Sequence, residues 1–508
     1  MLITEKEQLK KYQAPFRLWQ GVPGIEVTKK GRVFSCFYSG GIEEDLGKNF
    51  VALVYSDDGV AFGEPVAVAF EENARCFDGC VWIDPMDRLW LIWAKYTAFG
   101  NYGVYAAICD NPDAERLVWG EEFLIGYDVM MNKPTVLSTG EWLFPVSVWG
   151  EAIWETRMPE RRTKQAEAGA FAYRTTDGGK TFERLGGMIH PDHCYDEHMF
   201  VECQDGTLAL YSRIMHGIGV AYSYDRGKTW SQGIDSGLGG PNSRFHIRKL
   251  KSGRWLLVNH PENTNRNKLV AYLSEDEGKT WPYSLVVEDR DQVSYPDAVE
   301  AEDGFLYITY DRERGGGQKS MDAVYRHARE VLYAKVTEED IMAGEVKNPK
   351  SKQMQVISRL GEYTGDENPF EHPVREQEIA EYLIQFEDSV AIETLFTRYR
   401  SWEKTLSGQT GEQADALLDG RTPDNRIEVF RRVLTLLSYE AIPERYPVVE
   451  KVQQVLLQQP DTEMDADMVA DILGVSRHWL KFCFERETGI SVETYQQTLR
   501  KTKLYIHE

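Results

Sequence analysis

The chain has 508 residues, with 81 acidic and 58 basic side chains and a formal net charge of −23 at pH 7. This length is sufficient for two or more domains with hydrophobic cores of their own. The negative charge argues against a protein that binds broadly to nucleic-acid phosphates, and it leaves room for a local basic pocket.

The seven cysteines are scattered and odd in number, and no pair of Cys-x-x-Cys motifs occurs. The sequence therefore indicates neither a disulfide framework nor a zinc site, and we expect no metal or organic cofactor. Residues 1–11 lack the apolar segment of a signal peptide, and no apolar run is long enough to span a membrane. We predict a soluble, cytoplasmic protein that does not bind membranes. The sequence does not indicate its oligomeric state.

One motif recurs six times in the first two thirds of the chain. Each copy is a dipeptide, followed about eight residues later by a turn and then by a strand rich in aromatic, aliphatic and β-branched residues. The dipeptides begin at Val22, Asp78, Lys133, Glu197, Arg244 and Tyr295, and the turns fall at Gly31, Asp87, Gly140, Gly206, Gly253 and Gly304. This period predicts a mainly β fold, a six-bladed β-propeller over residues 1–345. A β-sandwich or another number of blades is the alternative.

Three eight-residue stretches, 175–182, 223–230 and 274–281, share an Asp, a Gly-Lys-Thr run and a final aromatic residue. A degenerate copy occupies 56–62. They resemble the Asp-box, or BNR repeat, of the sialidase superfamily. The Asp carboxylate suits the turn N–H groups, the Gly permits positive φ, and the aromatic ring packs on the blade. We therefore expect the boxes to be structural.

The innermost strand of each propeller blade begins near the central axis, so the six dipeptides are expected to surround a funnel. The residues there are polar, ionisable or aromatic, which predicts a binding or catalytic site. The candidates are Gln20, Asp78, Lys133, Glu197, His198, Arg244, Tyr295 and Asp297.

The sialidase resemblance extends to individual residues. Glu197 stands 16 residues before Arg213, Tyr295 opens a similar strand pair, and Arg266 precedes an Asp-box. The resemblance implies a Tyr295 nucleophile assisted by Glu197, with Arg213 and Arg266 binding a substrate carboxylate. The chemistry is sound because a neighbouring carboxylate activates a phenol that is a weak nucleophile at its free pKa.

The sequence departs from the sialidase pattern at the first arginine of the carboxylate-binding triad. Gly21 occupies its position, and Arg17 would need a local insertion to replace it. The acid/base residue would lie within 43–45, where Asp45 is our candidate and the glutamates at 43 and 44 are alternatives.

The remaining ring residues suggest an acidic glycan. Lys133, Arg244 and the two arginines of the resemblance offer cations for a uronate or another carboxylated sugar. His198 and His246 offer general acid/base groups, or each is a core histidine bonded to a blade turn.

We therefore expect a sialidase-like glycoside hydrolase that acts exo on an acidic or deoxy sugar of imported oligosaccharides and differs from a standard sialidase. Two alternatives keep the fold. One is a lyase acting on a uronate-containing glycan, and the other is a non-catalytic sugar-sensing regulator.

The composition changes after about residue 345. Residues 346–375 are predicted to be a linker, and 376–508 a smaller all-α domain. Residues 464–505 resemble one helix-turn-helix of the AraC family, on the spacing of Gly474, Ser476 and Leu480. An AraC-type reader has two such units, and this segment is acidic, so we favour a helical packing or oligomerisation module over DNA recognition.

Overall fold

The structure is a computed structural model that describes most of residues 1–360 and part of the C-terminal region. The described residues are 1–14, 17, 19–40, 49–71, 74–97, 102–127, 129–149, 168–263, 265–314, 329–360, 447–458, 462, 464–473, 480–481, 484, 488 and 490–497. The chain divides into two compact units, of which the first comprises Met1–Gly40, Gly47–Arg314 and Arg329–Leu360.

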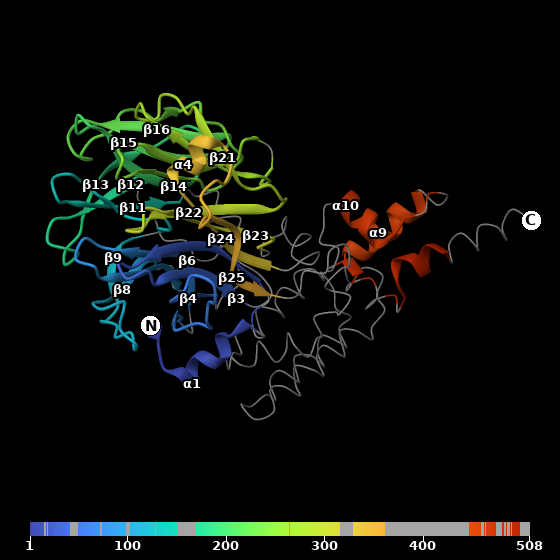
Figure 1. The fold of residues 1–508 in the computed structure, drawn as a ribbon. Coiled ribbons are helices and arrows are strands. Elements are labelled where there is room, and N and C mark those ends of the chain that lie inside the picture. The colour runs from blue at the N-terminus through green and yellow to red at the C-terminus, as the bar shows by residue number, and fades with distance from the viewer. Residues whose placement is uncertain are drawn as a thin grey trace, which may run out of the picture. The chain divides into compact units, whose positions relative to one another are not determined.

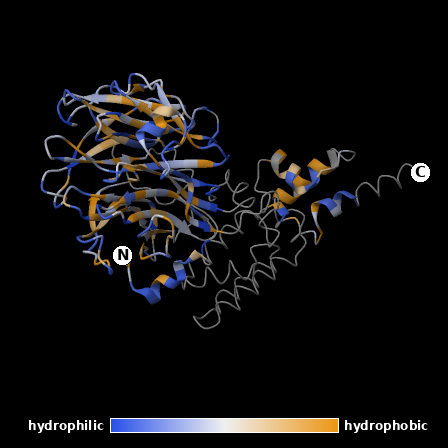
Figure 2. Cartoon of the chain, viewed as in Figure 1, coloured by the Kyte–Doolittle hydropathy of each residue, from blue (hydrophilic) through white to orange (hydrophobic). Residues whose placement is uncertain are grey.

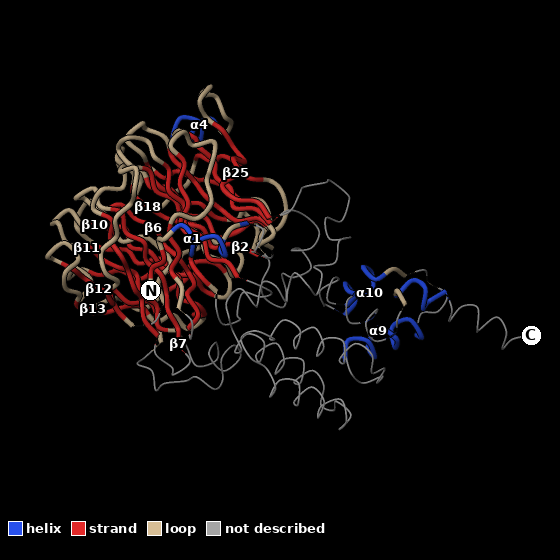
Figure 3. The backbone as a smooth tube through the Cα atoms, turned by 90° about the horizontal axis from the view of Figure 1, so that it is seen from below, coloured by secondary structure: helices blue, strands red, loops and turns tan. Residues whose placement is uncertain are grey.

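Within its described residues, the first unit contains six antiparallel sheets, which confirms the predicted six-bladed β-propeller (Figure 1). Strands account for most of this unit, as Figure 3 shows. Blade one is formed by β1 (Leu2–Ile3), β2 (Trp19–Val27), β3 (Val33–Gly40), β4 (Phe50–Ser56) and β5 (Ala67–Ala69). Blade two is formed by β6 (Ala74–Ile83), β7 (Leu89–Thr97), β8 (Tyr102–Cys109) and β9 (Phe123–Gly126). Blade three is formed by β10 (Thr135–Val136), β11 (Trp142–Val148), β12 (Gly169–Thr175) and β13 (Glu183–Met188).

The other three blades follow the same order along the chain. Blade four is formed by β14 (His193–Glu202), β15 (Leu208–Ile214), β16 (Gly217–Ser223) and β17 (Ile234–Asp235). Blade five is formed by β18 (His246–Lys249), β19 (Trp255–Asn259), β20 (Leu269–Ser274) and β21 (Tyr283–Glu288). Blade six is formed by β22 (Val293–Glu300), β23 (Leu306–Arg312), β24 (Arg329–Val336) and β25 (Lys352–Leu360). Short helices α1 (Lys6–Leu9) and α4 (Glu338–Ala343) and a 3₁₀ turn at Lys10–Tyr12 complete the unit.

The six predicted turns join the two innermost strands of each blade, and every turn residue has positive φ. The values are 92° at Gly31, 61° at Asp87, 91° at Gly140, 84° at Gly206, 90° at Gly253 and 78° at Gly304. This left-handed conformation explains why glycine fills five of the six positions.

The Asp-boxes are structural turns, as predicted. In the box of blade four, Asp225 Oδ1 accepts the Thr229 backbone N–H at 2.8 Å, and Oδ2 accepts the Thr229 hydroxyl at 2.6 Å. The same bonds recur at Asp177 and Asp276. These bonds from the threonine side chain and backbone lower the pKa of each carboxyl, so the boxes are ionised at neutral pH.

Apolar residues concentrate on the strands and hydrophilic ones on the loops, as Figure 2 shows. Between blades two and three, Trp82 packs edge-on against Trp142 at a ring-centroid distance of 5.0 Å, and Trp90 joins them. Such aromatic clusters bury large areas between blades and hold the ring together.

The ring closes where blade one meets blade six. Gln20 donates from its amide to the carbonyls of Arg329 and Ser358 at 3.0 Å each. The backbone N–H of Val22 donates to Asp311 Oδ2 at 2.8 Å. Strand β1 pairs with β5 of its own blade, so these cross-blade bonds, rather than a strand shared between the chain ends, connect the two blades.

Four inner strands carry a bulge at the same place. The register shifts in β2, β6, β14 and β22, next to a residue with positive φ. These residues are Val22 (51°), Asp78 (49°), Asp196 (51°) and Tyr295 (55°). Left-handed backbone costs a non-glycine residue about 1–2 kcal/mol, and such strain gathers at functional sites. In blade four the bulge residue is Asp196, one position before the predicted Glu197.

The propeller extends farther than the predicted boundary at 345. Strand β25 is the fourth strand of blade six and lies inside residues 346–375, which we predicted to be a linker. The reason is that β25 is a polar outer strand, with exposed and half-buried residues over most of its length, so it lacks the apolar pattern of the inner strands.

In the second unit the structure describes helices α9 (Pro447–Gln458) and α10 (Ala466–Leu473) and a turn of helix at 492–497. Buried apolar side chains of both helices pack in this unit, including Val452, Leu456 and Val469. The rest of the predicted all-α domain, with Gly474 and Ser476 of the predicted helix-turn-helix, lies outside the described residues.

Candidate active site

Tyr295, Glu197 and Arg213 meet in a buried hydrogen-bonded cluster. The Tyr295 hydroxyl donates to Glu197 Oε1 at 3.1 Å. Arg213 Nη1 donates to the same carboxylate oxygen at 2.8 Å and to the Tyr295 hydroxyl at 2.9 Å. Between 2% and 7% of each residue's surface is exposed. A phenol, a carboxylate and a guanidinium from blades six and four thus share one site, although they are far apart in sequence.

The backbone explains how Tyr295 reaches this site. It occupies the bulge of β22, and the bulge turns its side chain out of the regular alternation of the strand. Arg213 lies near the end of β15, which pairs with β14, the strand that holds Glu197. A bulge and a strand end are therefore the local features that bring the three side chains together.

The cluster sits among guanidinium groups. The Arg266 guanidinium lies 5.2 Å from the centre of the Tyr295 ring, and that of Arg314 lies 4.4 Å from it. Burial lowers the pKa of Arg266, and the guanidiniums of Arg213 and Arg314 lower it further. An anion bound here would relieve this repulsion.

Burial also raises the pKa of Tyr295, and the neighbouring Glu197 carboxylate acts in the same direction, while the arginines oppose it. Burial disfavours the charged form of Arg213, but Glu197 more than offsets this, so its pKa is raised. The phenol is therefore protonated at rest, and it needs a base before it can act as a nucleophile. Glu197 is placed to be that base.

Asn242 holds two of the arginines. Its side-chain oxygen accepts from Arg213 Nε at 2.6 Å, and its backbone carbonyl accepts from Arg213 Nη2 at 3.0 Å and Arg266 Nη2 at 2.9 Å. Sequence reasoning missed this residue. Its position in a Gly-Gly-Pro-Asn turn before β18 predicts a loop and carries no sign of a contact with arginines.

Arg314 was missed as well. It lies two residues after the end of β23 and beside Gly21 of β2, where a Cβ atom would lie 2.0 Å from Arg314 Cδ. The predicted substitute for the missing first arginine, Arg17, lies instead over the Phe37 ring and donates to the Ser358 hydroxyl.

A second buried cluster contains four of the residues that the sequence analysis singles out, Lys133, Arg244, His246 and Asp297. Lys133 Nζ lies 2.8 Å from Asp297 Oδ2 and 3.2 Å from Glu26 Oε1. Arg244 and His246 lie 3.7 Å and 3.3 Å from Asp297 Oδ1. Burial works against the charge on Asp297, but Lys133 and His246 lower its pKa below the usual range. Lys133 and Arg244 thus pair with Asp297, in a cluster other than that of Tyr295, Glu197 and Arg213.

His198 bonds to the backbone of its own surroundings. Its Nδ1 lies 2.8 Å from the Asp196 carbonyl oxygen and its Nε2 lies 2.9 Å from that of Phe171. Burial lowers its pKa to about 4, which favours the neutral ring. This is the arrangement of a core histidine, the alternative that the sequence left open.

The remaining predicted residues lie elsewhere. Gln20 closes the ring between blades one and six. Asp78 takes the bulge position in β6 that Tyr295 takes in β22. The acid/base candidate Asp45, with both alternatives, lies outside the described residues.

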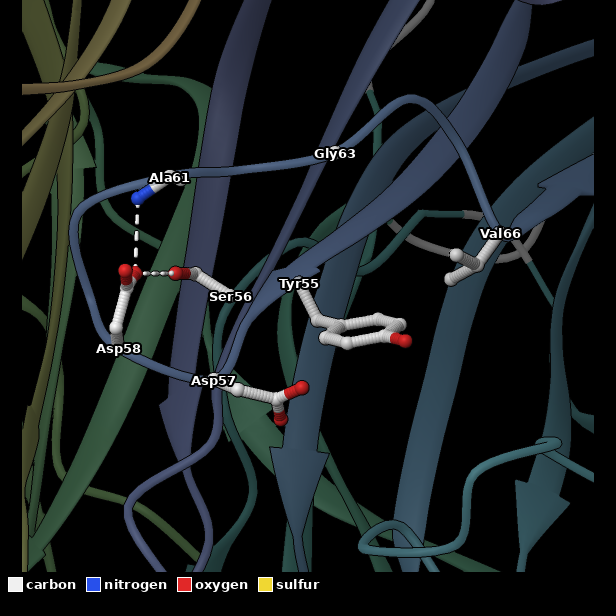
Figure 4. A pocket seen from close by; sticks show the side chains of 7 residues that line it. All are labelled: Tyr55, Ser56, Asp57, Asp58, Ala61, Gly63 and Val66. Atoms are coloured by element: carbon white, nitrogen blue, oxygen red, sulfur yellow. Dashed lines mark hydrogen bonds between the residues drawn. The ribbon is translucent and has the colours of Figure 1, made fainter.

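A surface hollow of about 360 Å³ lies away from this cluster, beside the degenerate Asp-box of blade one (Figure 4). Asp58 accepts there from the Ser56 hydroxyl and from the backbone of Ala61, so its carboxylate is committed to the turn. Within the described part of the chain, no group of three or more His, Cys, Asp or Glu side chains is placed to hold a metal ion. No described helix is both long and apolar enough to cross a membrane.

A sequence profile of the BNR repeat-like domain matches residues 32–308, more than half of the chain. The protein therefore belongs to the BNR repeat-like domain family, and its fold is that of a sialidase-like propeller. No curated protein sequence matches it.

Solved structures of sialidases are similar to this chain in fold. The leech intramolecular trans-sialidase complexed with 2,7-anhydro-Neu5Ac is 15% identical with a TM-score of 0.50, over 65% of this chain and 69% of that one. A Hadza microbial sialidase is 16% identical with a TM-score of 0.47, over 58% of this chain and 64% of its own, so less than two thirds of its length is matched. A Dyadobacter fermentans protein of unknown function is 16% identical with a TM-score of 0.47, over 59% of this chain and 92% of that one. At such identities the likeness concerns the fold alone.

Proposed function

We propose that the protein is a sialidase-like glycoside hydrolase that removes a terminal acidic or deoxy sugar from an oligosaccharide, with Tyr295 as its nucleophile. The observation that carries this proposal is the buried Tyr295 hydroxyl bonded to Glu197 Oε1 and Arg213 Nη1. A phenol with a raised pKa is poorly reactive alone, so a carboxylate within hydrogen-bond reach is the partner that a nucleophilic role requires.

The chemistry proceeds in two balanced steps. In the first, Tyr295 Oη attacks the anomeric carbon, its proton passes to Glu197, and the glycosidic C–O bond breaks as the leaving oxygen takes a proton from an acid in 43–45. In the second, water donates a proton to the carboxylate that was the acid and attacks the same carbon, and the bond between that carbon and Tyr295 Oη breaks to release the phenolate. Glu197 then returns its proton to the phenolate. The net change is the addition of one water across the bond.

Among the described residues, three guanidiniums lie beside Tyr295, those of Arg213, Arg266 and Arg314. Two described carboxylates pair with them, Glu197 with Arg213 and Asp311 with Arg314. This cluster of guanidiniums favours an acidic sugar over a neutral one, because planar guanidiniums suit a carboxylate. Short imported oligosaccharides in the cytoplasm are the proposed substrates.

The experiment is a screen of the purified full chain on chromogenic sialosides, uronides and rhamnosides, with released sugar and ultraviolet absorbance followed together. Tyr295→Phe should reduce turnover by a factor of at least about 10³, since it removes the nucleophile. The matched control is Tyr310→Phe, because Tyr310 also donates to a buried glutamate, Glu288, at 3.1 Å. Equal turnover in Tyr295→Phe and the wild type would refute the proposal.

The same screen tests the two alternatives. A lyase would produce an unsaturated uronate that absorbs in the ultraviolet, and it needs a base near the sugar. His198 is a poor candidate for that base because both its nitrogens contact backbone carbonyls. Sugar binding without turnover on every substrate would indicate the sensing regulator.

For residues 376–508 we favour a helical packing or oligomerisation module over a DNA reader. The buried apolar faces of α9 and α10 support a packed helical unit. A DNA reader would retard duplex DNA of some specific sequence at physiological salt, whereas a packing module would not.

A further inference from the structure

We propose that Arg314 is a carboxylate-binding residue of this site, positioned in the space that Gly21 leaves open. The inference rests on the proposed function, since it names the chemical group of the substrate that the Tyr295 site recognises. A carboxylated sugar is the ligand class, and the guanidiniums of Arg213, Arg266 and Arg314 together form its anion site.

The first support is that three guanidinium groups converge on Tyr295. The three guanidiniums come from the end of β15, the loop before β20 and the loop after β23, and all three lie against Tyr295. Cations repel one another, and burial makes that repulsion stronger. The chain as a whole has a net charge of −23, so three guanidinium groups around one phenol are unlike its average surface. Their placement therefore indicates a site for an anion.

The second support is the fit between Arg314 and Gly21. A Cβ atom at Gly21 would lie 2.0 Å from Arg314 Cδ and 2.1 Å from its Cγ. Any side chain at position 21 would thus exclude Arg314 from its present place. Gly21 is not among the residues with positive φ, so the backbone does not demand glycine here. Space for the arginine side chain is what the glycine provides.

The third support is that other parts of the fold fix Arg314. Its Nη1 lies 3.8 Å from Asp311 Oδ2, and Asp311 is itself held by the Ser294 hydroxyl at 2.6 Å and the Val22 N–H. Its guanidinium carbon lies over the Tyr295 ring, 4.4 Å from the ring centre. A planar, pre-positioned fork of this kind matches a carboxylate better than an ammonium group does. The same geometry accounts for the glycine at the position where the sialidase pattern predicts an arginine.

The test measures binding by calorimetry, separately from turnover, with a methyl sialoside and a methyl glucuronide, each compared with its own carboxamide. Arg314→Ala should weaken binding of the better carboxylate by about tenfold to a hundredfold and leave the carboxamide unaffected. The control is Arg254→Ala, which removes a guanidinium paired with Glu275 and Glu338 on blade five. It should change neither affinity.

Gly21→Ala gives a second, independent test that removes no charge. It should weaken carboxylate binding when Arg314 is present, because the new methyl group displaces that side chain. In the Arg314→Ala background its effect should be much smaller, since the two closest atoms, Arg314 Cδ and Cγ, are absent and the close contact that remains is Asp311 Oδ2 at 2.9 Å.

Unchanged carboxylate affinity in Arg314→Ala would overturn the inference, as would equal losses for carboxylate and carboxamide. Failure of the wild type to bind either carboxylate would also overturn it. In each of these cases the hydrolase proposal is judged separately, by the turnover of Tyr295→Phe.

Discussion

The side chains of the predicted candidates fall into two clusters. Glu197, Arg213, Arg266 and Tyr295 come together, whereas Lys133, Arg244 and Asp297 pair with one another. The sialidase resemblance implies the first group, because each member stands where the sialidase pattern has a residue of the same type. It does not separate the second group, since regular alternation would place Tyr295 and Asp297 on the same face of β22, and the bulge at Tyr295 changes this.

We expect Asn242 to position the guanidinium of Arg213. Asn242→Ala removes the side-chain acceptor of Arg213 Nε, so the Arg213 fork should lose its fixed orientation. We expect kcat/KM on the substrate found in the screen to fall by about tenfold to a hundredfold, with a small change in thermal stability. A loss of stability large enough to unfold the protein at the assay temperature would contradict a positioning role.

His198 gives a pH-dependent prediction. Its pKa is lowered to about 4 in the folded protein, whereas an unfolded histidine has a value of about 6.5. The unfolded state therefore binds more protons between these values, so the contribution of His198 is complete above pH 6.5 and is lost as the pH falls toward 4. The loss amounts to about 3 kcal/mol at most.

Urea unfolding at pH 7 and pH 4.5 measures this contribution. His260 has a similar shift, so the comparison must be made within one protein pair. His198→Gln should lose less stability between the two pH values than the wild type does. An equal loss in both proteins would show that His198 is not the titrating group.

Among the structural elements, the Asp-box turns recur in blades three, four and five. The Asp-box position after the aspartate is glycine in blade three (Gly178, φ 73°), but it is Arg226 (62°) in blade four and Glu277 (59°) in blade five. The sequence predicts the turn at all three, since the aspartate, the following glycine and the threonine recur. It does not predict that arginine and glutamate adopt left-handed backbone there.

Replacing Arg226 by glycine should therefore stabilise the protein. Relief of left-handed strain outweighs the conformational entropy of glycine, and the exposed Arg226–Glu141 pair contributes little. We expect a gain of up to about 1 kcal/mol in unfolding free energy, measured by urea titration. The reverse change, Gly178→Ala, should destabilise the protein, and a gain from that change would contradict the argument.

Across the whole molecule, the sequence predicts the parts of the fold that repeat regularly and misses the parts that do not. Six turns and six apolar strands give the number of blades. The outer strand β25 was assigned to a linker because a polar strand at the edge of a sheet lacks the period of a half-buried one. Asn242 and Arg314 lie in loops, where contacts depend on tertiary structure, and no local pattern identifies them.

The central ion cluster supports the whole ring, since it joins blades one, three, five and six. Lys133→Met leaves Glu26 and Asp297 buried without their main cation, and we expect a loss of about 3–5 kcal/mol in unfolding free energy. Lys335→Met breaks a bond of similar length to the exposed Asp303 and should cost less than about 1 kcal/mol. Similar losses in the two variants would show that the cluster is not a structural centre.

The most direct test of the central claim is mass spectrometry of the protein after incubation with a fluorinated acidic glycosyl fluoride, whose ring fluorine slows release of the sugar. The account predicts a mass increase of one glycosyl unit, located on the peptide that contains Tyr295 and absent from Tyr295→Phe. Turnover of the parent substrate with the adduct on another residue, or with undiminished labelling of Tyr295→Phe, would contradict it.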